Sequence, residues 1–284
     1  MTRTLRKAAA VLRAAGIQDA EFEARMLVAY VTGLPFSAVR LGDMPVDPDR
    51  LAPLLARRVM REPMALIVGH VGFWTLELAV SPATLIPRAD SEAVVEAALA
   101  HFAAGRVLDL GTGTGCLLLS VLSERPGAWG VGVDISAEAA GLARGNAAAN
   151  GLAGRAAFLC GDWARALAGR FELVLSNPPY IETAAIGGLM PEVRNHEPAR
   201  ALDGGVDGLD AYRALLAALP GLLAPEGVAV FELGFGQAEA VTALAEAAGL
   251  ECVDMKNDLG GVARALVLRA AGAQKSVGSA AAPG

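Results

Sequence analysis

The chain has 284 residues, of which 54% are hydrophobic and 19% are charged, so it can bury a large core and is not a disordered chain. Its formal net charge of −6 argues against a protein that binds nucleic acid through general positive charge. Three widely spaced cysteines offer neither a disulfide framework nor a zinc-binding spacing, which favours a reducing compartment and no metal site. No apolar run approaches the ~18 residues of a membrane span, and Arg13 interrupts any signal-peptide core. We therefore expect a cytoplasmic monomer without direct contacts to nucleic acid or membrane.

Three helices are predicted at the start of the chain. The first covers residues 4–15, the second runs from a cap at Asp19 to Gly33, and Asp47 caps the third. Together they predict a small helical bundle over residues 1–64. Three basic side chains at its end are expected to form a solvated face: Arg57, Arg58 and Arg61.

The pattern changes to β at Ala65. Apolar residues up to Val80 suggest a hairpin, and we expect residues 65–88 to link the bundle to a larger body. Asp90 or Ser91 is then expected to cap the helix that opens this body.

Between residues 89 and 270 strands and helices alternate, which is typical of a parallel α/β sheet. The long segment 181–209 is predicted to be a functional loop, and the tail 271–284 is expected to be disordered. The predicted strands are 106–110, 130–133, 156–160, 171–176, 227–233, 251–255 and 264–268.

The first strand of the body ends in a glycine-rich loop. Its sequence is Asp109-Leu110-Gly111-Thr112-Gly113-Thr114-Gly115. The glycines let the backbone pass close to a ligand, and open N–H groups at the turn into a helix favour an anionic group. The dinucleotide fingerprint needs its third glycine at position 116, which is Cys116. The loop instead fits the amino-acid end of S-adenosylmethionine, which needs backbone donors and a carboxylate such as that of Asp109.

Acidic residues also follow the next two strands. Asp134 can accept both hydroxyls of a ribose, Asp162 can accept from an adenine amino group, and the Trp163 ring can pack on the adenine face. Each residue alone is as typical of a helix cap or a core aromatic. Their order favours a ligand site, since all lie at the carboxyl ends of strands, where open α/β sheets bind ligands.

The fourth strand ends in Asn177-Pro178-Pro179-Tyr180. Proline cannot donate to a sheet, so the chain must leave the strand at Asn177 in a stiff, extended shape. The Asn177 amide, the Pro178 carbonyl and the Tyr180 ring then predict a rigid socket for a planar group that carries N–H bonds.

This set of motifs resembles the class I S-adenosylmethionine-dependent methyltransferases and, among them, the release factor glutamine methyltransferase (PrmC/HemK) family. The resemblance covers residue 4 to about residue 269. Its markers are Arg61-Glu62-Pro63, Phe73-Trp74, Leu85-Ile86-Pro87-Arg88, Asp109–Gly115, Asp162-Trp163, Ser176–Tyr180, Glu197-Pro198, Ala201–Gly205 and Asp207-Gly208-Leu209.

The resemblance implies a mostly parallel, Rossmann-like sheet with helices on both faces, and S-adenosylmethionine as the cofactor. The implied reaction is methylation of the side-chain amide nitrogen (N5) of the glutamine in the Gly-Gly-Gln motif of class I peptide chain release factors, which would dock on the bundle. Asn177, Pro178 and Tyr180 are the implied catalytic residues. Pro179 would join them in binding substrate, and Asn177 would also contact the cofactor.

Two alternatives stay open. The Asn177–Tyr180 motif is shared with enzymes that methylate the N6 amino group of adenine or the N2 amino group of guanine, but no basic groove or target-recognition domain is evident in the sequence. A scaffold that binds S-adenosylmethionine or a release factor without catalysis would have no use for the socket.

Overall fold

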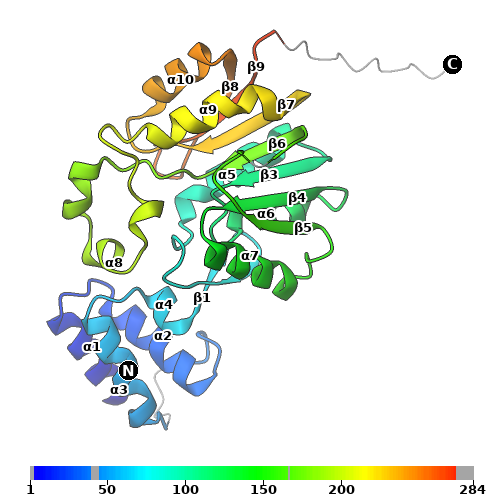
Figure 1. Cartoon of the computed structure of the whole chain (residues 1–284). Helices are drawn as coiled ribbons and strands as arrows, with labels where there is room; N and C mark the ends of the chain where they lie inside the picture. Colours follow the sequence, from blue (N-terminus) through cyan, green and yellow to red (C-terminus); the bar gives the residue numbers. More distant parts are fainter. Residues whose placement is uncertain (1–2, 40–44, 166, 273–284) are drawn as a thin grey trace.

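The computed structural model describes residues 3–39, 45–165 and 167–272 (Figure 1). A group of N-terminal helices is followed by a two-stranded hairpin and then by a larger α/β body. Most of the predicted disordered tail, from residue 273 onward, lies outside the described residues.

Apolar residues from three helices of the N-terminal bundle meet in a small core. Leu5, Leu27 and Leu51 are buried together there, each from a different helix. Burial of these aliphatic side chains supplies the main driving force for a bundle of this size. The bundle helices are α1 (Arg3–Ala14), α2 (Ala20–Thr32), α3 (Pro48–Val59) and α4 (Met64–Val68).

The helix caps of the bundle confirm part of the prediction. Gly33 ends α2 in the left-handed region with a φ of 69°, and the Asp47 carboxylate accepts the Asp49 N–H at 2.9 Å to cap α3. Asp19 was expected to cap α2, but its side chain makes no capping hydrogen bond. Its backbone φ of −91° and ψ of 38° differ from the extended shape that a side-chain cap needs.

Two further predictions for this region are wrong. The β pattern expected from Ala65 begins with the short helix α4, since Pro63 precedes it and a short apolar run does not distinguish a helix from a strand. The arginines at the end of α3 are not all solvated. Arg58 is only 6% exposed and pairs with Glu23 at 2.6 Å and with Glu192 of the body at 3.0 Å.

The hairpin follows α4 directly. It consists of β1 (His70–Phe73) and β2 (Leu76–Ala79), which pair in an antiparallel register. Phe73 and Leu78 are buried in the core of the body, so the hairpin packs on the body.

The body is built on a seven-stranded sheet in the order β5-β4-β3-β6-β7-β9-β8. Neighbouring strands are parallel except at β9, which runs antiparallel to both β7 and β8. The strands are β3 (Arg106–Leu110), β4 (Trp129–Asp134), β5 (Ala156–Cys160), β6 (Phe171–Ser176), β7 (Leu223–Glu232), β8 (Leu250–Asn257) and β9 (Ala263–Ala270).

Helices cover both faces of this sheet. The core on one face contains Val94, Leu118 and Ala143 from α5, α6 and α7, and the core on the other contains Leu216 and Val241 from α9 and α10. Burial on both faces explains the nearly continuous apolar runs in the central strands. The predicted class I methyltransferase fold is therefore confirmed. The covering helices are α5 (Glu92–His101), α6 (Cys116–Glu124), α7 (Ala137–Ala149), α9 (Asp210–Leu222) and α10 (Ala238–Ala247).

The long segment after β6 leaves the sheet and extends toward the bundle (Figure 1). Both Arg58 and Arg61 of the bundle form ion pairs with Glu192 of this segment, at 3.0 and 3.1 Å. The segment thus joins the two parts of the molecule. It contains three short helices, η2 (Thr183–Gly188), α8 (Pro191–Arg194) and η3 (Ala199–Ala201).

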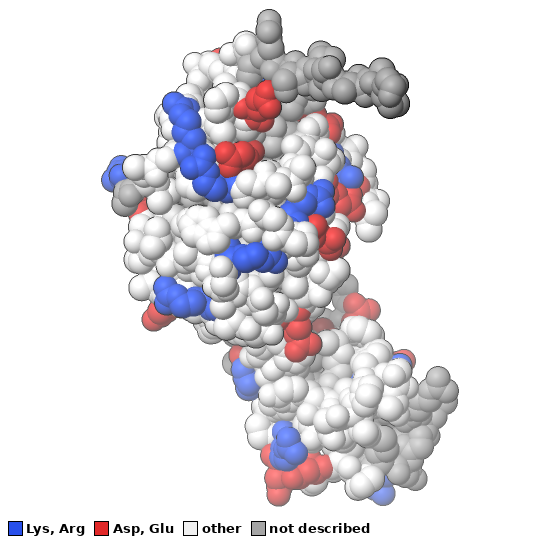
Figure 2. Space-filling view, turned by 90° about the vertical axis from the view of Figure 1, so that its right-hand side faces the viewer, with Lys and Arg blue, Asp and Glu red and all other residues white. Residues whose placement is uncertain are grey.

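The surface carries charges of both signs. On the face shown in Figure 2, Lys and Arg side chains are scattered among Asp and Glu and form no continuous basic surface. In the part of the chain that the structure describes, no helix combines the length and the apolar character needed to cross a membrane.

Candidate active site

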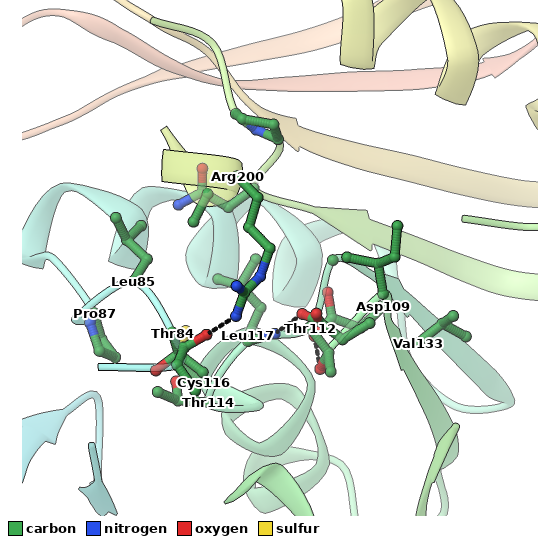
Figure 3. A pocket seen from close by; sticks show the side chains of 18 of the residues that line it. Thr84, Leu85, Pro87, Asp109, Thr112, Thr114, Cys116, Leu117, Val133 and Arg200 are labelled. Carbon is green, nitrogen blue, oxygen red and sulfur yellow. Dashed lines mark hydrogen bonds between the residues drawn. The ribbon is translucent and has the colours of Figure 1, made fainter. Parts of the chain in front are cut away.

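A pocket opens at the carboxyl ends of β3, β4, β5 and β6, beneath η3 (Figure 3). Gly115, although predicted to bind the cofactor, does not line the pocket and instead occupies the N-cap of α6. The other predicted cofactor residues all line it: Asp109, Gly111, Thr112, Gly113, Thr114, Asp134, Asp162, Trp163 and Asn177.

The glycine-rich loop turns from β3 into α6 with backbone angles that favour glycine. Gly111, Gly113 and Gly115 have φ values of 76°, 54° and 82°. A Cβ atom at Gly111 would meet the Trp163 ring at 3.3 Å, whereas at Gly113 the nearest atom would be in Thr84, at 4.0 Å. The backbone at Gly111 therefore packs closely against the Trp163 ring, whereas there is free space beside Gly113.

The N–H groups of this loop are less open than the sequence predicts. Two of them donate to the carbonyl of Val133, one to the carboxylate of Asp134 and one to a carbonyl within the loop. The four donors are Gly111, Thr112, Gly113 and Gly115. Within residues 111–115 only the Thr114 N–H donates to no acceptor of the described chain. These bonds fix the loop against β4 and leave few backbone donors for an anion.

Asp109 is a buried acid at the end of β3. It is 1% exposed, and its Oδ2 accepts the Thr112 hydroxyl at 2.6 Å, while its Oδ1 has no hydrogen-bond partner in the described residues. Burial, reinforced by the charge of Asp134, raises the pKa of the Asp109 carboxyl to about 7, although the hydrogen bond from Thr112 opposes this. A cationic ligand group beside Oδ1 would favour the ionised form.

Asp134 lies at the end of β4 and is held by two backbone donors. Its Oδ2 accepts the Gly113 N–H and its Oδ1 accepts the Ser136 N–H, both at 2.9 Å. A carboxylate oxygen can accept more than one hydrogen bond, so both remain able to accept ligand hydroxyls. The carboxylate is thus oriented in advance.

Asp162 and Trp163 follow β5. Asp162 pairs with Arg165 at 2.8 Å, and Trp163 has a φ of 46°, a left-handed conformation that is uncommon for a bulky residue. Such a conformation costs about 1–3 kcal/mol and persists only where the surroundings impose it. Here the Trp163 ring packs at Gly111 and against the core on the sheet face that α9 and α10 cover, and it also lines the pocket.

Asn177 leaves the sheet at the end of β6. Its Nδ2 donates to the Ser91 hydroxyl at 3.3 Å, which orients the amide. Neither Asn177 Oδ1 nor the Pro178 carbonyl accepts a hydrogen bond within the described chain. Asn177 and Pro179 line the pocket, whereas Pro178 is buried. The two acceptors proposed for an amide are therefore free.

Tyr180 does not line the pocket. Its hydroxyl donates to Glu232 Oε1 at 3.2 Å, and its carbonyl accepts from Gln237 Nε2 at 3.0 Å. A Cβ atom at Gly208 would lie 2.4 Å from the Tyr180 carbonyl oxygen, so only glycine fits there. Burial and the charge of Glu232 raise the pKa of Tyr180, which keeps its hydroxyl protonated. The backbone of this turn is held by contacts that are distant in sequence.

Four residues of the site were not identified from the sequence. Asp90 or Ser91 is expected to cap the helix α5. Ser91 does occupy its N-cap position, at the end of η1 (Ala89–Ser91), but its side chain makes no capping bond and instead accepts from Asn177. Glu232, at the end of β7, is 2% exposed, and burial raises its pKa while the Ser91 and Tyr180 hydroxyls oppose this. An acid at a strand end was an available signal for Glu232.

Thr84 and Arg200 also line the pocket, and no local pattern marks either of them.

The buried polar atoms of the pocket fit the amino-acid end of S-adenosylmethionine. Asp109 Oδ1 and the hydroxyls of Thr84 and Thr114 are buried, line the pocket and have no partner in the described residues. Buried polar atoms are rarely left unpaired, so these three indicate a polar ligand.

Two family models match the chain. Residues 3–69 match the model described as PrmC N-terminal domain, and residues 89–192 match the one described as Methyltransferase small domain. The first match falls on the bundle and the second contains the glycine-rich loop and Asn177.

Proteins similar to this chain along most of its length bear one name. The release factor glutamine methyltransferase of Rhodospirillum rubrum is 49% identical over 273 residues, which cover 94% of this chain and 84% of that protein. The release factor glutamine methyltransferase of Bradyrhizobium diazoefficiens is 46% identical over 277 residues, which cover 93% of each.

Among solved structures, a methyltransferase from Pyrococcus furiosus shares the fold of the body. It is 16% identical, with a TM-score of 0.53 that covers 78% of this chain and 98% of that one. The full-length similarity to curated relatives, together with both family models, shows that the chain belongs to the release factor glutamine methyltransferase family.

Proposed function

We propose that this protein transfers a methyl group from S-adenosylmethionine to the side-chain amide nitrogen (N5) of the glutamine in the Gly-Gly-Gln motif of class I peptide chain release factors. The observation that carries the proposal is a pair of acceptors that are free in the described chain, Asn177 Oδ1 on a residue that lines the pocket and the carbonyl of the next residue, Pro178. The family of the chain supports the substrate, since its curated relatives bear the name of this reaction.

The cofactor is held by the residues at the ends of β3, β4 and β5. The Asp109 carboxylate accepts from its ammonium, Asp134 accepts from its ribose hydroxyls, and Asp162 with Trp163 encloses its adenine. S-adenosylmethionine supplies an activated methyl group on a positively charged sulfur. The chain therefore has to bind and orient, and needs no group that activates the donor.

The acceptor amide requires orientation because its nitrogen lone pair is delocalised. Asn177 Oδ1 and the Pro178 carbonyl each accept one hydrogen of the glutamine NH2 group. Two bonds in fixed directions favour a pyramidal nitrogen and direct its lone pair toward the pocket. Holding two reactants in this way supplies a large part of many enzymatic rate enhancements.

A strong base is not needed, because nitrogen loses its proton readily once it is methylated. Tyr180 is unsuited to that role, since its raised pKa keeps it protonated and its hydroxyl donates to Glu232. We propose that the Tyr180 ring, which does not line the pocket, acts as a rigid wall of the socket that Asn177 and Pro178 form beside it.

The bundle is proposed to dock the release factor. Arg58 and Arg61 of the bundle form ion pairs with Glu192. Glu192 belongs to the long segment after β6, which also contains η3 and so contributes to the pocket. This connection would let a protein substrate bound to the bundle present one loop to the socket.

A competition assay tests the function. The protein would be incubated with methyl-labelled S-adenosylmethionine, an unmethylated release factor, and DNA and RNA in the same tube. We expect label in the release factor alone. Label in a nucleic-acid base, with none in the release factor, would show that the socket holds an adenine or guanine amino group instead.

A further inference from the structure

We propose that Arg200 binds the carboxylate of the methionine part of S-adenosylmethionine and so selects ligands that carry an amino-acid end. This deepens the proposed function and relies on its cofactor. The sequence predicts that the glycine-rich loop binds this end of the cofactor, and the proposal adds Arg200, which lies outside that loop.

The glycine-rich loop has few free donors for a carboxylate. The loop between β3 and α6 was expected to offer its N–H groups to the carboxylate, but among residues 111–115 only that of Thr114 is free of an acceptor in the described chain. A carboxylate accepts several hydrogen bonds and, near the acids Asp109 and Asp134, needs a compensating positive charge. The loop alone does not provide one.

Arg200 places a guanidinium with unused donors at the pocket. It projects from η3 across the pocket toward the segment that contains Thr84 (Figure 3). Its Nη2 donates to the Ala83 carbonyl at 2.6 Å, and it forms no ion pair with the described residues. A guanidinium has five N–H donors in a planar fork that matches a carboxylate, so most of its capacity is unused. Its exposed position keeps the cost of desolvation small.

Two buried hydroxyls on residues that line the pocket have no partner in the described residues. Thr84 follows the residue to which Arg200 donates, and its buried hydroxyl has no partner in the described structure. The buried Thr114 hydroxyl, on a residue that also lines the pocket, likewise has no partner in the described residues. A carboxylate at Arg200 would give such hydroxyls an acceptor. The ammonium of the same ligand would then satisfy Asp109 Oδ1.

The position of η3 is itself fixed. Glu197, two residues before η3, is 6% exposed, accepts the Ile86 N–H at 3.2 Å and pairs with Arg88. These bonds hold the start of η3 against residues 83–88. Arg200 therefore extends from an anchored element and needs little ordering when a ligand arrives.

The test measures binding rather than turnover. Affinities for S-adenosylhomocysteine, which has the amino-acid end, and 5′-methylthioadenosine, which lacks it, would be measured by calorimetry for the wild type and Arg200→Met. We expect Arg200→Met to lower the affinity for S-adenosylhomocysteine about 10- to 100-fold, which is the range for loss of a hydrogen bond to a charged group. The affinity for 5′-methylthioadenosine should fall by less than about twofold. Arg200→Lys should restore part of the loss.

The matched control is Arg194→Met, which removes an exposed arginine of the same segment that donates to the Gly187 carbonyl. It should leave both affinities unchanged. An equal loss for the two ligands in Arg200→Met, or no loss for either, would overturn the role of Arg200. Failure of the wild type to methylate a release factor, with the ligand difference intact, would overturn the proposed substrate and leave the role of Arg200 standing.

Discussion

The two ends of the pocket are built in different ways. At the cofactor end, the loop bonds to itself and to the adjacent strand β4, so residues within about one βαβ unit hold Asp109 and Asp134. At the acceptor end, Asn177 depends on Ser91, and the Tyr180 backbone depends on Gln237 and on the turn at 204–208. The bonds that hold Asp109 and Asp134 are thus local in sequence, whereas those that hold Asn177 and Tyr180 come from distant elements. Substitutions at the two ends should therefore affect binding and turnover separately.

The largest expected effect is at Asn177. Asn177→Ala removes one of two acceptors of the glutamine amide, and we expect turnover to fall by about 10²–10³-fold, as for loss of a positioned hydrogen-bonding group elsewhere. The affinity for S-adenosylhomocysteine should change by less than about threefold. Steady-state kinetics and calorimetry on one preparation would measure both. Parallel losses of affinity and turnover would mean that Asn177 serves mainly the cofactor.

The cofactor end should respond to pH. Because the pKa of Asp109 is about 7 in the free protein, the carboxyl is protonated at lower pH and can no longer pair with the ligand ammonium. We expect the Kd of S-adenosylhomocysteine to rise about tenfold for each pH unit below 7, and to be nearly constant above pH 8. Calorimetry from about 1.5 pH units below that pKa to about 1.5 units above it would test this.

Asp109→Asn is the matched control for this titration. It should bind more weakly at pH 8 and lose the dependence on pH. The ligand 5′-methylthioadenosine, which has no ammonium, should show no dependence with the wild type. A profile for wild type and S-adenosylhomocysteine that is flat through pH 7 would contradict the role of Asp109.

A smaller effect is expected at Ser91, which touches Asn177 but makes no helix-capping bond. Ser91→Ala should lower turnover about 2- to 10-fold, because one ordinary hydrogen bond that orients the Asn177 amide is lost. Cofactor affinity should stay within about twofold. The control is Ser123→Ala, whose hydroxyl donates to a carbonyl of its own helix. If Ser91→Ala and Ser123→Ala have the same turnover, Ser91 does not position Asn177.

The smallest effect is expected where the bundle meets the body. Glu192→Gln weakens the contacts to Arg58 and Arg61 but leaves Arg58 paired with Glu23. We expect a rise of about 2- to 5-fold in KM for the release factor and no change in cofactor affinity, because the Gln amide oxygen can still accept from both arginines and only the charge of the contact is lost. Glu21→Gln, which removes an exposed pair with Arg13 inside the bundle, is the control. An unchanged KM in Glu192→Gln would argue against this connection.

The same contrast explains how much the sequence could predict. The strands and the acids at their ends follow from apolar runs and local motifs, which is why Asp109 and Asp134 were found at one pocket. Ser91 and Glu232 act through contacts with residues far away in sequence, and although Glu232 is an acid at a strand end, no local pattern indicates which residues they contact. The prediction that Arg58 is solvated is wrong for the same reason, since its partner Glu192 is 134 positions away.

The open N–H groups of the loop illustrate a second limit. A glycine-rich turn predicts free backbone N–H groups, but the register of β3 with β4 decides whether those N–H groups donate to residues of β4 instead. That register is a tertiary property. Because the loop donors are used in this way, Arg200 is the cation available to a carboxylate, and it lies on a segment that the sequence predicts only as a long loop.

The central claim is that the socket at Asn177 and Pro178 receives a glutamine side-chain amide. Tandem mass spectrometry of a release factor after reaction with the protein tests it most directly. We predict one added methyl group on the side-chain amide nitrogen of the Gly-Gly-Gln glutamine, and none when that glutamine is replaced by glutamate. A methyl group on any other residue of the release factor, or one that persists in the glutamate variant, would contradict the account.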